Sequence, residues 1–340
     1  MGDPTVTDRL LTSLLDAATH HLRGDAIAIG AAVDDALEFA HRGSLADERV
    51  DRRTVFYGAS VTKQIIGVAT ARAVVEGRES TDDSIVQWLP ELPSSMSAIR
   101  LGHLIHHTSS LPDVCDPAAG VPRSNAEVID RLQRIEAVHD GPGTQYAYNN
   151  AGYVLLAEAL ARSGERPIDE LVRELLTPLD LPDTRLGGPA VRLEDTPDPP
   201  GTIGDGGLWT SVLDLTRWLQ ACNMAAFGAR TQQLAESTTT LADGSPIDYA
   251  WGVRVARSTS GRIITHGGSW HSWLAKSVRI PEQRVAVAVL SFGATELDVS
   301  RAGTDLATAI ASTKRERAPG GSAVPQQNRR LPEPSGTLPE

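Results

Sequence analysis

Ser60 and Lys63 stand three residues apart in the stretch Ser60-Val61-Thr62-Lys63. Residues 61–76 carry apolar side chains at helical spacing, so we expect the two side chains one turn apart on one helix face. A serine hydroxyl is a weak nucleophile until a base removes its proton, and a desolvated lysine amine can be that base. The backbone N–H groups of the helix N-terminus would lie close to a developing oxyanion. The spacing indicates serine-based acyl transfer, although a helix-capping serine beside an exposed lysine has the same pattern.

Tyr148 and Asn150 form a second candidate group. They follow the turn-rich segment 141–144 and precede a helical pattern, so we expect their side chains to project from a loop into a cleft. A tyrosine beside a lysine ammonium can carry the proton from nucleophile to leaving group. Asn150 can hold the lysine or a substrate amide by hydrogen bonds. The alternative is a tyrosine packed under the helix with Asn150 as its N-cap.

A third group, His266-Gly267-Gly268, closes the strand-like run 262–266. Glycines at a strand end allow an extended substrate backbone to approach the strand edge. The histidine offers a polar or pH-dependent contact. A simple strand-end turn is the alternative.

The order Ser60-Xaa-Xaa-Lys63, Tyr148-Xaa-Asn150, His266-Gly267-Gly268 resembles the three-motif signature of the serine β-lactamase and penicillin-binding-protein superfamily. The tyrosine version resembles its class C branch, which contains class C β-lactamases, DD-carboxypeptidases, D-aminopeptidases and family VIII esterases. The resemblance covers roughly residues 10–315. It includes the flanking segments 56–59, 104–109, 143–146 and 206–210.

The resemblance implies an acyl-enzyme on Ser60, with Lys63 and Tyr148 as the proton-handling residues. The backbone N–H groups of Ser60 and Ser269 would form the oxyanion hole. The implied substrate-binding residues are Asn150, His266, Gly267, Gly268 and Ser269.

Two departures from the family pattern bear on substrate and geometry. His266 stands where β-lactamases and many transpeptidases have lysine, so a fixed positive charge for a substrate carboxylate is missing. This favours esters, D-amino-acid amides or acyl transfer over a dedicated penicillinase. Ser110 stands where the family usually has glycine, which predicts an altered turn beside the cleft.

The predicted fold class is α+β and β-lactamase/transpeptidase-like, an antiparallel sheet flanked by helices plus an all-helical domain. We expect a discontinuous sheet domain (1–79 and 206–315), a helical domain (80–205) and a disordered tail (316–340). The predicted sheet draws strands from both ends of the chain: 26–32, 36–41, 250–257, 262–266, 274–280 and 284–292.

Composition excludes several classes of protein. A net charge of −11 argues against nucleic-acid binding, which needs clustered lysine and arginine. No apolar run approaches the ~20 residues of a membrane span, and residues 1–24 lack the apolar core of a signal peptide. We therefore expect a cytoplasmic protein, or an exported one if a leader was removed.

Neither a metal nor a cofactor is predicted. His103, His106 and His107 lack a convincing third ligand, and Cys115 and Cys222 have no metal-ligand spacing and read as ordinary buried thiols. The predicted function is a serine hydrolase whose partner is a small-molecule ester, amide or short peptide. The alternatives are an intracellular acyltransferase using the same acyl-enzyme and a penicillin- or peptide-binding sensor without turnover.

Overall fold

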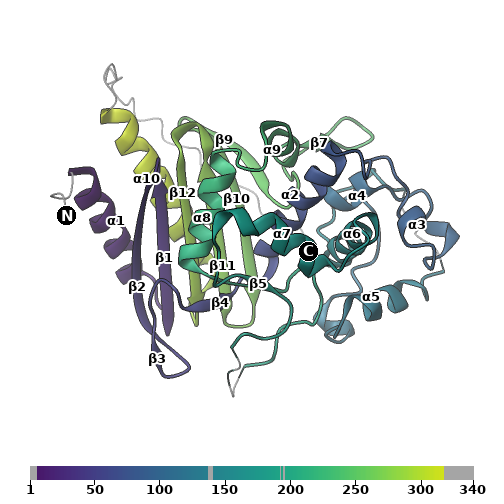
Figure 1. Cartoon of the computed structure of the whole chain (residues 1–340), viewed down its shortest axis with the longest axis horizontal. Coiled ribbons are helices and arrows are strands. Elements are labelled where there is room, and N and C mark those ends of the chain that lie inside the picture. Colours follow the sequence, from purple (N-terminus) through teal and green to yellow (C-terminus); the bar gives the residue numbers. More distant parts are fainter. Residues whose placement is uncertain (1–5, 137–140, 192, 194–195, 318–340) are drawn as a thin grey trace, which may run out of the picture.

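The computed structural model describes residues 6–136, 141–191, 193 and 196–317. Its main feature is a seven-stranded antiparallel sheet with the order β3-β2-β1-β12-β11-β10-β9 (Figure 1). The N-terminal strand β1 therefore lies beside the last strand, β12, as predicted for a sheet drawn from both ends of the chain. Its strands are β1 (Ala26–Val33), β2 (Ala36–Leu45), β3 (Glu48–Arg49), β9 (Arg254–Ser258), β10 (Gly261–Trp270), β11 (Trp273–Ile280) and β12 (Val285–Phe292).

The neighbouring strands β1 and β12 are apolar on both faces, because helices cover the sheet on both sides. Branched residues such as Ile27 and Val287 belong to the core under α1 (Val6–His21) and α10 (Glu296–Arg317). Side chains alternate along a strand, so the small residues between them face the other core, against α8 (Val212–Asn223). Small residues let α8 lie close to the sheet.

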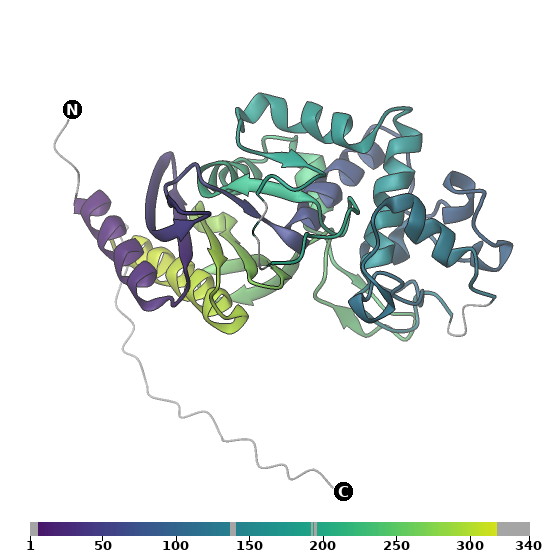
Figure 2. The same cartoon turned by 90° about the horizontal axis from the view of Figure 1, so that it is seen from below.

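The helical region lies at the opposite side of the molecule from α1 and α10 (Figure 2). Its central helix, α6, contacts most of the others, and α2 is buried nearly all round between this region and the sheet. The helices are α2 (Thr62–Val75), α3 (Ile85–Trp88), α4 (Leu101–Ile105), α5 (Asn125–Leu132), α6 (Asn150–Ser163), α7 (Ile168–Leu176) and α9 (Ala229–Ala235).

Short elements connect these layers. A three-stranded sheet, ordered β4-β6-β5, leads into the segment that carries Ser60. The short strands are β4 (Val55–Tyr57), β5 (Arg185–Leu186), β6 (Leu208–Ser211), β7 (Thr239–Thr240) and β8 (Pro246–Ile247). The 3₁₀ helices are η1 (Ala59–Val61), η2 (Ser94–Met96), η3 (Pro117–Ala119), η4 (Thr177–Leu179) and η5 (Pro281–Gln283).

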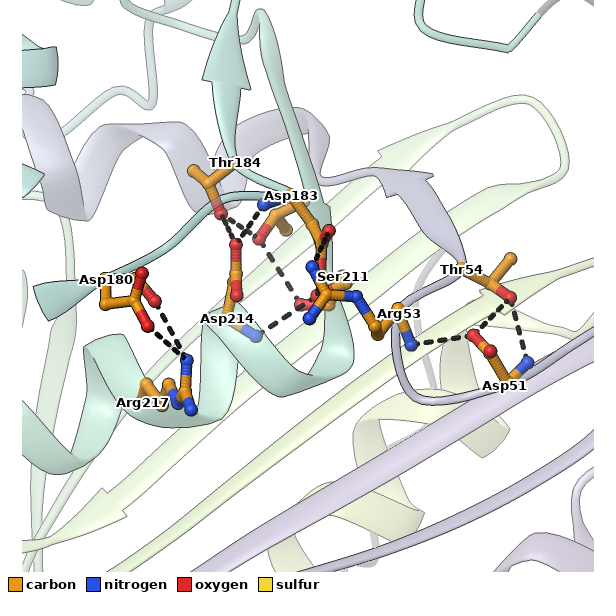
Figure 3. Close-up of polar contacts among 10 residues, drawn as sticks. Asp51, Arg53, Thr54, Asp180, Asp183, Thr184, Ser211, Asp214 and Arg217 are labelled. Carbon is orange, nitrogen blue, oxygen red and sulfur yellow. Dashed lines mark hydrogen bonds and ion pairs between the residues drawn. The ribbon is translucent and has the colours of Figure 1, made fainter.

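A buried carboxylate joins the start of α8 to the loop before β5 (Figure 3). Asp214 Oδ2 accepts hydrogen bonds from the Asp183 N–H (2.7 Å) and the Thr184 hydroxyl (3.0 Å). Ser211 caps α8 by accepting from the Asp214 N–H and donates to Asp183, which also pairs with Arg53 at 2.8 Å. This network holds the β4–β6 pair in place beneath the Ser60 segment.

The structure corrects several predicted boundaries. The strand expected at 250–257 begins at Arg254, because a turn with Gly252 at φ +79° precedes it. The strand expected at 262–266 runs from Gly261 to Trp270, so the His266-Gly267-Gly268 motif lies within it and not at its end.

Further differences concern the domain limits. The segment 80–205 contains the short strand β5 besides its helices. Residues 316–317 belong to α10, and the rest of the predicted tail lies outside the described residues. The predicted domain limits otherwise stay a prediction. In the described part of the chain, no helix combines the length and apolarity that a membrane crossing requires.

Candidate active site

Ser60 lies in η1, the 3₁₀ turn between β4 and α2, and not in the α-helix itself. The preceding residue, Ala59, has φ +44°, in the left-handed region that residues other than glycine rarely adopt. The Thr62 hydroxyl holds this turn, because it donates to the Ala59 carbonyl (2.6 Å) and accepts from the Leu208 N–H (3.1 Å). The strained turn presents the Ser60 side chain at the cavity wall.

Lys63 is fully buried, which contradicts the alternative of an exposed lysine. Its Nζ donates hydrogen bonds to Ser60 Oγ (3.1 Å), Asn150 Oδ1 (2.8 Å) and the Asp205 carbonyl (2.8 Å). An ammonium has three N–H donors, so these acceptors use all of them. The amine is therefore held in one position beside the serine hydroxyl.

Tyr148 lies on the cavity side of Lys63. Its ring centroid is 4.9 Å from Lys63 Nζ, and 39% of the residue is exposed, so it is not packed under the helix. The ring stacks on His107 with a centroid distance of 4.4 Å, and His107 Nδ1 accepts from the Asn149 N–H (3.1 Å). Burial holds the pKa of His107 well below its usual range, so this ring is an uncharged support for the tyrosine.

Asn150 is the first residue of α6, and its neighbour Asn149 is the N-cap, with a side chain that accepts from the Gly152 N–H. The N-cap of α6 is therefore Asn149, whereas the alternative interpretation of the sequence placed it at Asn150. Asn150 Nδ2 and its backbone N–H both donate to Asp113 Oδ2 at 3.1 Å. Asp113 thereby orients the amide whose oxygen holds Lys63, and sequence reasoning missed this residue.

His266 is buried, and both its ring nitrogens have partners. The Tyr249 hydroxyl donates to Nε2 (2.9 Å), and Nδ1 donates to the Gly267 carbonyl (2.5 Å). Burial, and secondly the nearby Lys63 charge, lower the pKa of His266 to about 3. The imidazole is uncharged at neutral pH, which excludes the pH-dependent contact considered from the sequence.

Gly268 has a structural role that the sequence did not reveal. A Cβ at this position would lie 2.2 Å from the Gly58 carbonyl oxygen and 3.2 Å from the Ser60 nitrogen. Only glycine lets β10 lie this close to the turn that carries the serine. The pairing of β9 with β10 ends at Thr265 in the described chain, so the strand edge beyond it borders the cavity.

A cavity of about 440 Å³ joins the three motifs. Lys63 lies beneath this cavity and is not part of its wall. Ser110, whose hydroxyl donates to the Gly141 carbonyl (3.4 Å), has φ +58°, so serine maintains a left-handed turn where glycine would be less strained. The predicted residues that line the cavity are Ser60, Tyr148, Asn150, His266, Gly267, Gly268 and Ser269.

Within residues 6–136, 141–191, 193 and 196–317, no group of three or more histidine, cysteine, aspartate or glutamate side chains is arranged to hold a metal ion. The polar groups at the cavity instead form a serine, lysine, tyrosine and asparagine cluster, a set suited to acyl transfer.

The family model described as Beta-lactamase matches residues 8–312, most of the chain. The chain belongs to the Beta-lactamase family. A penicillin-binding protein of Bacillus subtilis is 26% identical over 276 residues, which cover 70% of this chain and 60% of that protein. A D-aminopeptidase of Brucella canis is 22% identical over 313 residues, which cover 84% of this chain and 60% of that protein. The alignments thus span about 60% of the length of these relatives.

Solved structures share the fold. The β-lactamase/D-alanine carboxypeptidase of Yersinia pestis superposes with a TM-score of 0.76 at 18% identity, over 89% of this chain and 99% of that one. The octameric penicillin-binding protein homologue of Pyrococcus abyssi superposes with a TM-score of 0.74 at 21% identity, over 91% of this chain and 80% of that one. The superfamily and the predicted α+β, β-lactamase/transpeptidase-like fold class are confirmed.

Proposed function

We propose that this chain is a serine hydrolase that cleaves esters or amides through an acyl-enzyme on Ser60. The observation that carries the proposal is the fully buried Lys63, whose Nζ lies beneath the cavity, 3.1 Å from the Oγ of Ser60 in the cavity wall. Three hydrogen bonds offset the cost of burying this amine, and one of them holds the amine against a serine hydroxyl that lines a cavity, an arrangement typical of functional sites. The relatives named D-aminopeptidase and penicillin-binding protein make amides and short peptides candidate substrates.

The reaction proceeds in two steps. Ser60 Oγ attacks the carbonyl carbon while the Lys63–Tyr148 pair, with one of its two groups deprotonated, accepts the serine proton. The pair then returns that proton to the leaving group as its bond to the carbonyl carbon breaks. Water then attacks the acyl-enzyme, releasing the acid and restoring the serine hydroxyl. We assign the oxyanion hole to the backbone N–H groups of Ser60 and Ser269, because Gly268 brings β10 against the serine turn.

Ser60→Ala tests the nucleophile. The unmodified protein should release p-nitrophenol from p-nitrophenyl butyrate and react covalently with a fluorophosphonate, and both activities should vanish in the variant. Ser44→Ala, at an exposed position in β2, is the matched control and should keep both. Labelling that persists in the Ser60 variant would refute the assignment.

Lys63→Ala and Tyr148→Phe test the proton-handling pair. Each should slow acylation by roughly 100-fold or more, the usual contribution of general acid–base assistance. The rate of fluorophosphonate labelling and the pre-steady-state burst of p-nitrophenol measure acylation directly. A normal burst rate in either variant would remove that residue from the mechanism.

A substrate panel then separates the candidate activities. It comprises short-chain esters, D-amino-acid amides, D-Ala-D-Ala peptides and the chromogenic cephalosporin nitrocefin. An added amine that competes with water for the acyl group would indicate the acyltransferase. Stoichiometric labelling without turnover would indicate the sensor.

A further inference from the structure

Lys276 is a cation in the wall of the proposed acyl-transfer cavity. It lies in β11 directly opposite Gly267, the middle residue of the third motif. Ser60 lines the same cavity, so a ligand that fills the cavity contacts both residues.

The ammonium of Lys276 has no hydrogen bond or ion pair with any residue in the described part of the chain. The other two lysines differ: Lys63 donates three hydrogen bonds, and Lys314 donates to Asp34 and to the Gln283 carbonyl. Lys276 is nonetheless half-buried, and burial together with the charge of Arg254 lowers its pKa. A partly desolvated cation without a protein partner is stabilised when an anion binds it.

The packing around Lys276 accommodates its stem. A Cβ at Gly303 of α10 would lie 2.9 Å from Lys276 Cγ, so this glycine leaves the lysine room between the helix and the sheet. Arg254, the other cation in the wall, already pairs with Asp248 (2.6 Å) and donates to the Tyr146 hydroxyl (2.9 Å).

The remaining charges at this wall leave Lys276 as the cation available to a ligand. His266 is uncharged, so the third motif supplies none. Glu296, at the start of α10, lines the same cavity, and its negative charge partly opposes the lowering of the Lys276 pKa, but the two side chains form no ion pair among the described residues. Lysine is a compact point charge with three donors, and carboxylate is a matching acceptor.

We propose that Lys276, from the strand beside the third motif, binds a free carboxylate of the substrate. The preferred substrates are then esters, amides or short peptides that carry a carboxylate near the scissile group. This inference rests on the proposed function and revises the sequence-based expectation that the site lacks a fixed positive charge.

The experiment compares two pairs of esters that differ only in charge. In one pair the leaving group is 3-carboxyphenol or its neutral 3-carbamoyl isostere; in the other, the acyl group of a p-nitrophenyl ester is glutarate or its terminal amide. The unmodified protein should prefer the anionic member of at least one pair by about tenfold or more in kcat/KM, as expected for a charged hydrogen bond.

Lys276→Gln should abolish that preference through a higher KM for the anionic ester, so that the ratio of kcat/KM between the anionic and the neutral ester falls to about one. Lys276→Arg should retain much of the preference for the anionic ester, because arginine keeps the positive charge. Lys314→Gln, which makes the same charge change outside the cavity, should keep the full preference.

Two failures are distinguishable. Turnover and labelling with no charge preference in either pair, or a preference that Lys276→Gln leaves intact, would overturn the carboxylate proposal alone. Absence of both labelling and turnover would overturn the proposed function.

Discussion

The hydrogen bonds around Lys63 link four residues into one chain. Asp113 holds the Asn150 amide, the amide oxygen holds the Lys63 ammonium, and the ammonium donates to Ser60 Oγ. Because the amide cannot rotate without losing both partners, its oxygen and nitrogen are oriented by their contacts. The carboxylate of Asp113 therefore acts on the serine through two intermediates, as a positioning residue.

Asp113→Asn should lower kcat/KM by roughly tenfold, because the introduced amide donates where a carboxylate accepted two hydrogen bonds. A double-mutant cycle with Asn150→Ala measures the coupling, and the two losses should be far from additive. Additive losses together with a lower free energy of unfolding would assign Asp113 a purely structural role.

His266 should contribute no ionisation to the activity between pH 5 and pH 9. Burial, and then Lys63, lower the pKa of His266 to about 3, so its imidazole stays uncharged throughout this interval. The apparent pKa values in the kcat/KM profile should be the same for the unmodified protein and His266→Asn, even where the absolute rate falls. A limb near pH 6 to 7 that disappears in the variant would contradict this assignment.

At the scale of elements, the site depends on the contact between β10 and η1. The two elements can lie this close only because Gly268, which faces Gly58, has no Cβ. The neighbouring Gly267 differs, because a Cβ there would have its nearest contact, the Ala275 carbonyl oxygen, at 3.9 Å. The two adjacent glycines provide a matched comparison.

Gly268→Ala should displace β10 from the serine turn and reduce fluorophosphonate labelling of Ser60 by roughly 100-fold, as expected when catalytic groups move by about 1 Å. Gly267→Ala should cause a much smaller loss, because ordinary van der Waals space is free at that position. Equal losses in the two variants would show that close approach of β10 is not what Gly268 supplies.

At the scale of the whole molecule, the carboxyl group of Glu79 follows α2 in the chain and lies against the last residue of α6. Ser163 at the end of α6 donates to Glu79 Oε1 (2.6 Å), and Oε2 is buried without a hydrogen-bond partner in the described chain. Burial raises the pKa of Glu79 to about 7, from an ordinary value of 4.5. The folded state thus binds a proton more tightly than the unfolded state.

This difference predicts that Glu79 lowers the free energy of unfolding as pH rises from about 4.5 through 7. The loss reaches about 3 kcal/mol at the upper end of that interval. The sign follows because, in this interval, the folded protein holds more protons than the unfolded chain. Glu79→Gln removes the titration, so the variant should gain stability relative to the unmodified protein as pH rises. Urea unfolding of both proteins at pH 5 and pH 8 measures the gap, and an unchanged gap would contradict the prediction.

Local patterns in the sequence were sufficient for several elements and for the residue types of the site. The helical spacing of apolar residues over 61–76 predicts α2, which runs from Thr62 to Val75. Ser60 and Lys63 lie within one turn, so their proximity follows from local geometry alone. The order of the three motifs was enough to identify the superfamily, which the family match confirms.

Tertiary structure alone decided the contacts between distant segments. Asp113, Tyr249 and Lys276 carry no local pattern that marks them, and their roles arise from packing against Asn150, His266 and the cavity. The place of His266 within β10 depended on the partner strand β11, which extends the ladder past the motif. Periodicity reports which face of an element is apolar, but burial, pKa and hydrogen-bond partners depend on what the rest of the chain brings against that face.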